Sequence, residues 1–199
     1  MRILYLAIDQ RVPGTTGGPV HVAQVVTGLA ALGHEVHVAI TPGKETLPDS
    51  PVHWHFIRPP LGWRQLRWMR LRRVEALARK LRADVVIERY YNFGGEGVWA
   101  AARTGALAVL EVNAPIIDHP GSLKRWIDRA LVFEPMRRWR EWQCRHTNLF
   151  VTPSTSILPQ WVEPHRVIRL EWGADTARFT PEARGDVPFK LLDDVILLG

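Results

Sequence analysis

The stretch that decides the fold is GGPVHVAQVVTGLAALGHEVHV, residues 17–38, which follows a short apolar segment at residues 3–8. An apolar strand, a glycine pair, an amphipathic helix and a second strand form a βαβ unit, with which nucleotide-binding sheets of the doubly wound class begin. Glycine lets the backbone approach a phosphate closely, and the free N–H groups of the following helix then face the anion. The pattern is not G-x-G-x-x-G, so the alternative is that Gly17 and Gly18 only form a turn. This opening predicts an α/β domain that handles a phosphorylated ligand.

Length and composition indicate a globular protein. A chain of 199 residues with 46% hydrophobic and 23% charged residues fits a single domain. The single cysteine, Cys144, excludes an internal disulfide and has no metal-ligand spacing around it, which favours a reducing compartment. No apolar run reaches the roughly 18 residues that a transmembrane helix needs, and Arg2 is the only basic residue before the first apolar segment. We therefore expect a cytoplasmic protein that does not span a membrane.

Apolar and amphipathic segments continue to alternate along the rest of the chain. Strands are expected at residues 52–57, 84–88, 107–112, 149–152 and 167–170, and helices at residues 63–81, 95–103 and 123–145, the last interrupted by Pro135. This order predicts a doubly wound, Rossmann-like parallel sheet. Ligands of such sheets bind beyond the carboxyl ends of the strands. The loops at residues 9–18, 88–96 and 111–121 should therefore surround one crevice.

The positive charge is concentrated between residues 63 and 82. The chain carries a net charge of +6, and this segment holds eight basic residues against the single acid Glu75. At helical spacing its apolar side chains form one stripe, which should dock on the sheet: Trp63, Leu66, Met69, Val74, Leu77 and Leu81. Tryptophan among arginines suits a surface with anionic lipid headgroups. The expected membrane contacts are Arg64, Arg67, Trp68, Arg70, Arg72 and Arg73.

Two other interpretations of this basic segment remain open. Residues 124–145 repeat the mixture of arginine and tryptophan, and both segments could simply be solvated faces. The same mixture also suits phosphate contacts and base stacking in nucleic-acid binding, although no nucleic-acid-binding motif is present. An anionic membrane surface is the preferred partner, and nucleic acid is the less favoured one.

Six segments, in order, carry a resemblance to a known family. They are MRILYLAID, GGPVHVAQVVTGLAALGHEV, DVVIERY, LEVNAP, VTPSTS and WGADTARFTP. Together they resemble the N-terminal half of family 4 glycosyltransferases of the GT-B type. The resemblance implies two Rossmann-like domains facing a cleft, the first binding the acceptor and the second a nucleotide sugar. It also implies transfer with retention of anomeric configuration, with no cofactor and no catalytic metal.

The resemblance also implies a division of the chain. Residues 1–180 correspond to the acceptor-binding domain, and residues 181–199 to the interdomain linker and the first strand of a C-terminal donor domain. The family's paired glutamates, separated by seven residues, belong to that donor domain. Glu88 with Glu96 and Glu163 with Glu171 have the same spacing, but their sequence context differs. The 199-residue chain is therefore expected to be inactive by itself.

Several residues take expected roles from the resemblance. Gly17 and Gly18 match the glycine loop that lies against the donor diphosphate. Asn113 stands where many relatives carry a histidine that touches the donor sugar, and Asn113 and His119 are the only candidates for a catalytic role. The residues expected at the acceptor are His21, Arg89, Glu111, Asn113, Asp118 and His119. Each of these polar residues also has a plain structural interpretation, as a packed or solvated side chain.

The resulting hypothesis is the acceptor-binding half of a retaining, hexosyl-type glycosyltransferase on the inner face of a membrane. Its donor would be a nucleotide sugar, and its acceptor a lipid-linked or polysaccharide-precursor hydroxyl. The alternatives are a non-enzymatic Rossmann-like binding module, a subunit of a split transferase, and a basic nucleic-acid-binding protein.

Overall fold

The computed structural model describes residues 1–43, 46–47, 50–116, 134–171 and 173. Their strands form a parallel sheet in the order β3-β2-β1-β4-β5-β6-β7. The strands are β1 (Arg2–Val12), β2 (Glu35–Pro42), β3 (His53–Phe56), β4 (Val85–Arg89), β5 (Leu107–Glu111), β6 (Leu149–Thr152) and β7 (Val167–Arg169). The chain runs outward from β1 to β3 and then returns to β4 on the other side of β1, so the strand order reverses between β1 and β4. The expected doubly wound, Rossmann-like fold is confirmed.

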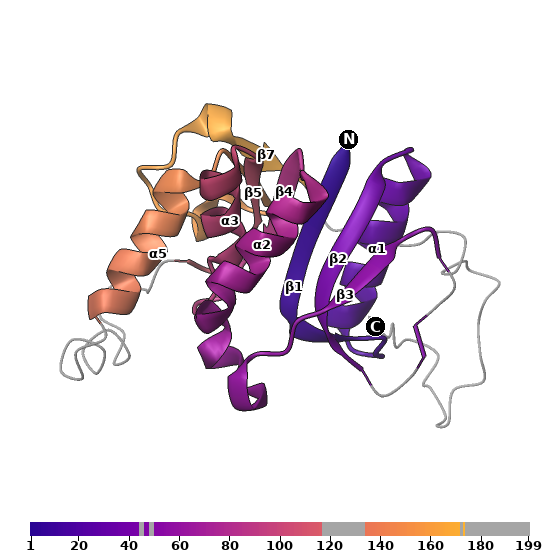
Figure 1. Ribbon diagram of the computed structural model, residues 1–199. Helices are drawn as coiled ribbons and strands as arrows, with labels where there is room; N and C mark the ends of the chain where they lie inside the picture. The colour runs from indigo at the N-terminus through magenta and orange to yellow at the C-terminus, as the bar shows by residue number, and fades with distance from the viewer. Residues whose placement is uncertain (44–45, 48–49, 117–133, 172, 174–199) are drawn as a thin grey trace, which may run out of the picture.

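Helices cover both faces of this sheet (Figure 1). Helix α1 (Gly17–Ala31) lies on one side, and α2 (Leu71–Leu81), α3 (Glu96–Thr104) and α5 (Glu134–His146) lie on the other. Alternation along β1 serves both layers, because Tyr5 and Ala7 join the core under α1 while Leu4 and Leu6 join the core under α2 and α3. A strand buried on both faces reads as a continuous apolar run, which explains why the first segment was identifiable from sequence.

Strand β1 extends further than expected. The apolar segment predicted a strand at residues 3–8, whereas β1 continues to Val12, with an irregularity in its pairing to β2 between Ala7 and Arg11. This extension carries Asp9 and Arg11 to the carboxyl edge of the sheet. Strands β3 to β7 and α3 begin and end within two residues of the expected positions. Strand β2 is the second strand expected in the opening βαβ unit.

The basic segment at residues 63–81 differs from the single helix that was expected. It forms a 3₁₀ helix, η2 (Arg64–Arg70), followed by α2. Val74, Leu77 and Leu81 pack on the core as predicted, but Trp63 and Met69 are exposed. Three residues per turn in η2, instead of 3.6, shift which side chains face the sheet. The predicted stripe was therefore wrong for Trp63 and Met69, whereas Leu66 is half-buried.

The remaining expectations fall partly outside the described residues. Helix α5 matches the second half of the segment predicted at residues 123–145, while residues 117–133 lie outside the described part of the chain. Residues 181–199, assigned to the linker and donor domain, also lie outside it. Among the described helices, none is long and apolar enough to cross a membrane.

Candidate functional site at the carboxyl edge of the sheet

The carboxyl ends of the central strands place polar side chains along one edge of the sheet. Asp9 lies near the end of β1, Glu88 and Arg89 end β4, and Glu111 ends β5. Strand order reverses between β1 and β4, and ligands of doubly wound sheets bind at such a switch point. Three features at this edge form the candidate site: a hollow at the end of β1, a buried cluster around Arg67, and a hydrogen-bonded group around Glu111.

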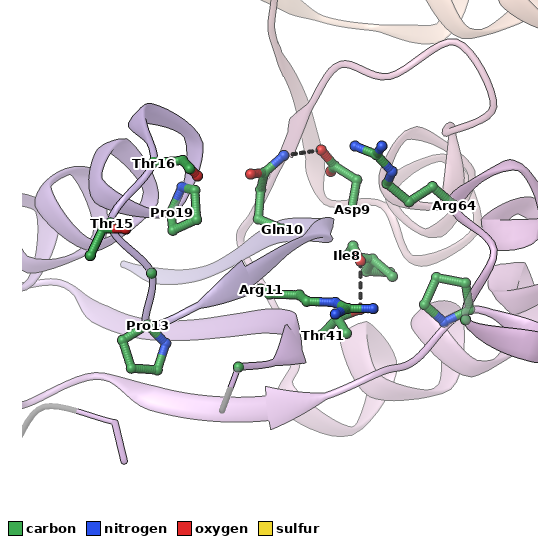
Figure 2. A pocket seen from close by; sticks show the side chains of 14 residues that line it. Ile8, Asp9, Gln10, Arg11, Pro13, Thr15, Thr16, Pro19, Thr41 and Arg64 are labelled. Atoms are coloured by element: carbon green, nitrogen blue, oxygen red, sulfur yellow. Dashed lines mark hydrogen bonds between the residues drawn. The ribbon is translucent and has the colours of Figure 1, made fainter. Parts of the chain in front are cut away.

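The hollow at the end of β1, called the β1 hollow below, has a volume of about 530 Å³. This size lies within the usual range for small-molecule sites. Figure 2 shows Thr15, Thr16 and Pro19 on one side of it and Asp9 and Arg64 on the other, with Arg11 near Thr41. Its walls therefore come from the end of β1, the start of α1 and the start of η2.

A buried cluster of charges lies beside this hollow. The guanidinium of Arg67 is fully buried and pairs with three carboxylates from separate elements. Its Nη1 lies 2.9 Å from Asp9 Oδ1, its Nη2 lies 3.1 Å from Glu88 Oε1, and its Nε lies 2.8 Å from Glu96 Oε1. Arg89 Nη1 adds a longer contact of 3.5 Å to Asp9 Oδ2. Asp9 lines the hollow, but its negative charge is already balanced by Arg67 and Arg89 inside the protein.

The cluster corrects the expectation that Arg67 contacts a membrane. A side chain with no exposed surface cannot reach lipid, and Arg67 has three carboxylate partners inside the protein. The pair Glu88 and Glu96, whose spacing resembled the family's paired glutamates, serves Arg67 instead. Sequence reasoning missed this cluster, and the available signal was Glu96 inside the glycine-rich stretch at residues 94–97, with Glu88 near the end of the preceding strand.

Burial sets the protonation of the cluster. Desolvation, together with the charge of Glu96, raises the pKa of Glu88 to about 7, although Arg67 and the N–H groups of α3 lower it. Burial opposes the positive charge of Arg67, but Glu96, Glu88 and Asp9 outweigh burial and raise its pKa. The cluster thus keeps Arg67 charged while one of its carboxyls titrates near neutral pH.

The glycines after β4 let Glu88 reach the start of α3. Backbone N–H groups of Gly95 and Gly97 donate to the two oxygens of Glu88 at 2.6 and 2.8 Å. Gly95 has a φ of 108°, a conformation that side-chain-bearing residues rarely adopt. A Cβ on Gly97 would lie 2.6 Å from a methyl carbon of Leu6 and 2.9 Å from the Cβ of Glu88, so any side chain there would displace Glu88. The local sequence therefore folds around the carboxylate.

Glu111 joins three other side chains at the end of β5. The hydroxyl of Tyr5 donates to Glu111 Oε2 at 2.6 Å, and the ring Nε2 of His21 lies 2.6 Å from Glu111 Oε1. The amide of Asn113 also donates to Glu111 Oε1. Burial opposes the charge of Glu111, but the hydrogen bonds from His21 and Tyr5 hold its pKa below the usual value. Burial beside the charge of Glu111 raises the pKa of Tyr5.

The structure therefore brings together three of the residues expected at the acceptor, namely His21, Glu111 and Asn113. Arg89 stands beside Glu111 on the neighbouring strand, but its guanidinium pairs with Asp9 and not with this group. Asp118 and His119 lie outside the described residues, so their expected roles stay predictions. Sequence reasoning missed Tyr5, because an apolar strand gives no sign of which hydroxyl meets an acid.

Gly17 and Gly18 begin α1 beside the β1 hollow. The preceding residues, Thr15 and Thr16, line that hollow, and Gly18 lies against the Gln10 side chain. The N-cap Thr16 makes no side-chain cap, so the first N–H groups of α1 are not satisfied by its hydroxyl. This geometry suits a phosphate, whose contact with the two glycines stays a prediction.

The other expected membrane residues lie at or near the surface. Arg64, Trp68, Arg72 and Arg73 are exposed, while Arg70 is half-buried and donates to the carbonyl of Arg58 at 2.9 Å. The described residues contain no group of three or more histidine, cysteine, aspartate or glutamate side chains arranged to hold a metal ion.

Comparisons with known proteins agree with this fold. Residues 15–178 match the sequence model of Glycosyltransferase Family 4. Sucrose-phosphate synthase from Thermosynechococcus elongatus is similar in structure, with a TM-score of 0.65 and 17% identity over 90% of this chain and 50% of that one. A glycosyltransferase from Rickettsia africae has a TM-score of 0.54 and 15% identity, and the match covers 94% of this chain and 51% of that one. Phytolacca americana UGT2, complexed with UDP-2fluoro-glucose and pterostilbene, has a TM-score of 0.54 and 12% identity, and the match covers 85% of this chain and 53% of that one.

The family match and the structural matches support different conclusions. At such low identity, the solved structures show a shared fold, whereas the family match covers most of the chain. The chain spans about half the length of each of these three structures. None of the curated proteins compared with the sequence matches it significantly.

Proposed function

The chain belongs to glycosyltransferase family 4, and from this premise we propose that it forms the acceptor-binding half of a retaining, hexosyl-type transferase that uses a nucleotide sugar. The observation that carries the proposal is the β1 hollow, which opens at the carboxyl end of the central strand β1 of a family 4 domain. Thr16 and Pro19, on either side of the glycine pair that begins α1, line its rim. An acceptor in the hollow would place its hydroxyl near this rim. The donor diphosphate would lie against Gly17 and Gly18.

In this proposal the group around Glu111, which lines a second hollow of about 470 Å³ on the other side of the start of α1, orients the part of the reactants that reaches it. Its carboxylate is held by Tyr5 and His21 in one position, and a positioned acceptor gains rate because fewer orientations must be lost on reaction. His21 stands on the first turns of α1, so it links this group to the glycine start of the helix. Asn113 completes the polar surface that would face the sugars.

The donor domain would come from a second half of the protein. The chain spans about half the length of its structural neighbours, and the neighbour from Phytolacca americana is complexed with UDP-2fluoro-glucose. We expect this second half to hold the nucleotide and to support the charge of the leaving diphosphate. No metal or cofactor is needed in this proposal.

A membrane surface is the proposed location, on the inner face. The exposed arginines on and after η2, with Trp68 among them, form a basic face that suits anionic lipid, and Arg67 is excluded from it. The proposed contacts are Arg64, Trp68, Arg72 and Arg73, with Arg70 at the edge. An acceptor attached to a lipid would then be presented near the β1 hollow, since Arg64 belongs to both surfaces.

A second candidate, a subunit of a split transferase, is favoured by one observation. The hollow of about 470 Å³ between α1 and β6 holds the Glu111 group at one end, and the rest of its lining is mainly apolar, with Val25, Leu29 and Val109 among the side chains. Leu170, at its edge, is 63% exposed. An apolar surface of this kind suits a partner subunit.

The test is an assay of nucleotide-sugar hydrolysis and transfer. It compares this chain with the chain extended through any sequence that follows Gly199 in its gene, using a panel of nucleotide sugars. Activity of the extended protein, lowered by His21→Ala or Glu111→Gln, supports the proposal. A folded extended protein that turns over no nucleotide sugar contradicts it, and activity that requires a separate polypeptide favours the split transferase.

A further inference from the structure

Three arginines from separate segments surround the β1 hollow and its neighbour. Arg11 and Arg64 line the β1 hollow, and Arg11 and Arg58 line an adjoining hollow of about 590 Å³. The two hollows share Arg11, Thr41, Gly43 and Gly62, so they adjoin over a common floor. The three arginines come from the end of β1, from the segment after β3, and from the start of η2. Their charges therefore gather around one depression.

These arginines lack acidic partners within the described part of the chain. Neither Arg11 nor Arg58 makes a side-chain hydrogen bond or ion pair there, and Arg64 only lies over the ring of Tyr91, at 5.9 Å. The nearest acid of the β1 hollow is Asp9, and its charge is already balanced by Arg67 and Arg89. Uncompensated charge of one sign along a cleft raises the local concentration of ions of the opposite sign.

The floor below them is rigid. The hydroxyl of Thr41 donates to the carbonyl of Ile8 at 2.7 Å, and the N–H of Gly43 donates to the carbonyl of Val12 at 3.1 Å. A Cβ on Gly43 would lie 2.6 Å from the carbonyl oxygen of Pro13, which shows how closely the ends of β1 and β2 approach. These contacts fix the backbone on both sides of Arg11, so that only the arginine side chain has to be ordered when a ligand binds.

We infer that the depression formed by the two adjoining hollows binds the phosphate group of an acceptor, through Arg11, Arg58 and Arg64. A guanidinium offers parallel N–H donors that match phosphate oxygens, and a phosphate monoester carries a charge of about −1.5 to −2 at neutral pH. Three guanidiniums can balance that charge. That the phosphate belongs to an acceptor rests on the proposed function, whereas the phosphate site itself rests only on the two hollows and their arginines.

The phosphate could belong to a soluble sugar phosphate or to a polyprenyl phosphate in a membrane. Both present the same oxyanion to the arginines, and they differ in what the rest of the molecule requires. The experiment therefore uses two probes. One is glucose 6-phosphate, with glucose as the neutral control, and the other is phosphatidylcholine vesicles with a polyprenyl phosphate, with the polyprenol as the neutral control.

Binding is measured by calorimetry for the sugars and by vesicle sedimentation for the lipids. The variant Arg11→Gln with Arg58→Gln is compared with Lys80→Gln and Arg82→Gln, which remove the same charge at the exposed C-terminal end of α2. We expect at least one phosphate probe to bind in preference to its neutral control. Loss of two charge-assisted contacts should weaken that binding at least roughly tenfold, and the control variant should bind within about twofold of the unaltered chain.

Both phosphate probes failing to bind, or binding equally to the two variants, would overturn the inference. Circular dichroism and thermal unfolding establish that each variant is folded, and Arg64→Gln, on a different segment, should weaken binding by itself. Failure here is distinguishable from failure of the proposed function. If phosphate binding requires Arg11 and Arg58 but the protein turns over no nucleotide sugar, the phosphate site is supported and only its assignment to an acceptor is contradicted.

Discussion

Arg64 and Arg67 stand one turn apart on the same short helix, and the structure uses them in opposite ways. Arg67 is fully buried and shares its charge among three carboxylates, while Arg64 is exposed at the rim of the β1 hollow and has no acidic partner within the described residues. The difference shows that charge density along a sequence does not separate structural arginines from binding arginines. The presence or absence of buried acids in the fold does.

The contrast between Arg67 and Arg64 is tested most directly by removing the buried charge of Arg67. Arg67→Met leaves Glu88 and Glu96 buried without a cation and leaves Asp9 with only its longer contact to Arg89. Removing one partner of a buried pair lowers the free energy of unfolding by about 3–5 kcal/mol. Urea unfolding followed by circular dichroism measures this loss. Arg64→Met is the matched control and should change stability by less than about 0.5 kcal/mol.

A compensating variant protects this test against simple misfolding. Adding Glu88→Gln and Glu96→Gln to Arg67→Met removes two of the stranded charges and should recover part of the lost stability. Equal stability of Arg67→Met and Arg64→Met would show that the cluster does not hold the fold.

The pH dependence of stability tests the protonation of Glu88, one of the buried partners of Arg67. The pKa of Glu88 is raised from 4.5 to about 7, so the folded state holds this proton more tightly than the unfolded state does. The contribution of Glu88 to the free energy of unfolding therefore falls as the pH rises from 4.5 to 7 and stays constant above that range, a fall of up to about 3 kcal/mol. Urea unfolding at a series of pH values, compared with Glu88→Gln, isolates this contribution. A pH dependence that is unchanged in Glu88→Gln contradicts it.

The smallest expected effect concerns the exposed arginines beyond the hollow. Arg72→Gln with Arg73→Gln should weaken binding to anionic vesicles by about 1 kcal/mol for each charge removed, without altering stability. Sedimentation with phosphatidylglycerol vesicles measures this, and Lys80→Gln with Arg82→Gln is the charge-matched control. Trp68→Ala tests the aromatic part separately. If the control releases the protein equally well, net charge alone explains the binding, and no membrane face exists at η2 and α2.

Local patterns were sufficient to predict the fold. The βαβ opening and the apolar strands follow from periodicity, and a parallel sheet was the only arrangement that their alternation with helices allowed. The resemblance to the family also placed His21, Glu111 and Asn113 at one crevice, where the structure shows them in contact. These features depend on neighbours in sequence or on the order of the strands.

The charge cluster could not be predicted in the same way. Its members, Asp9, Arg67, Glu88 and Glu96, come from four elements, and Arg67 stands among seven other basic residues with nothing local to distinguish it. The 3₁₀ geometry of η2 decided which arginine turned inward, and helical spacing predicted a different face. Long-range pairing of charges is a property of the packed fold, so a reading of separate segments misses it.

The buried cluster also constrains how this sequence can vary. An uncompensated charge in the interior is far more unfavourable than no charge at all, whereas replacing a whole buried set by apolar side chains is often neutral. Positions 9, 67, 88 and 96 should therefore change together among relatives of this protein. A homologue with an apolar residue at position 67 should lack most of the three acids, and a single loss among the four should be accompanied by a second substitution that restores the balance of charge.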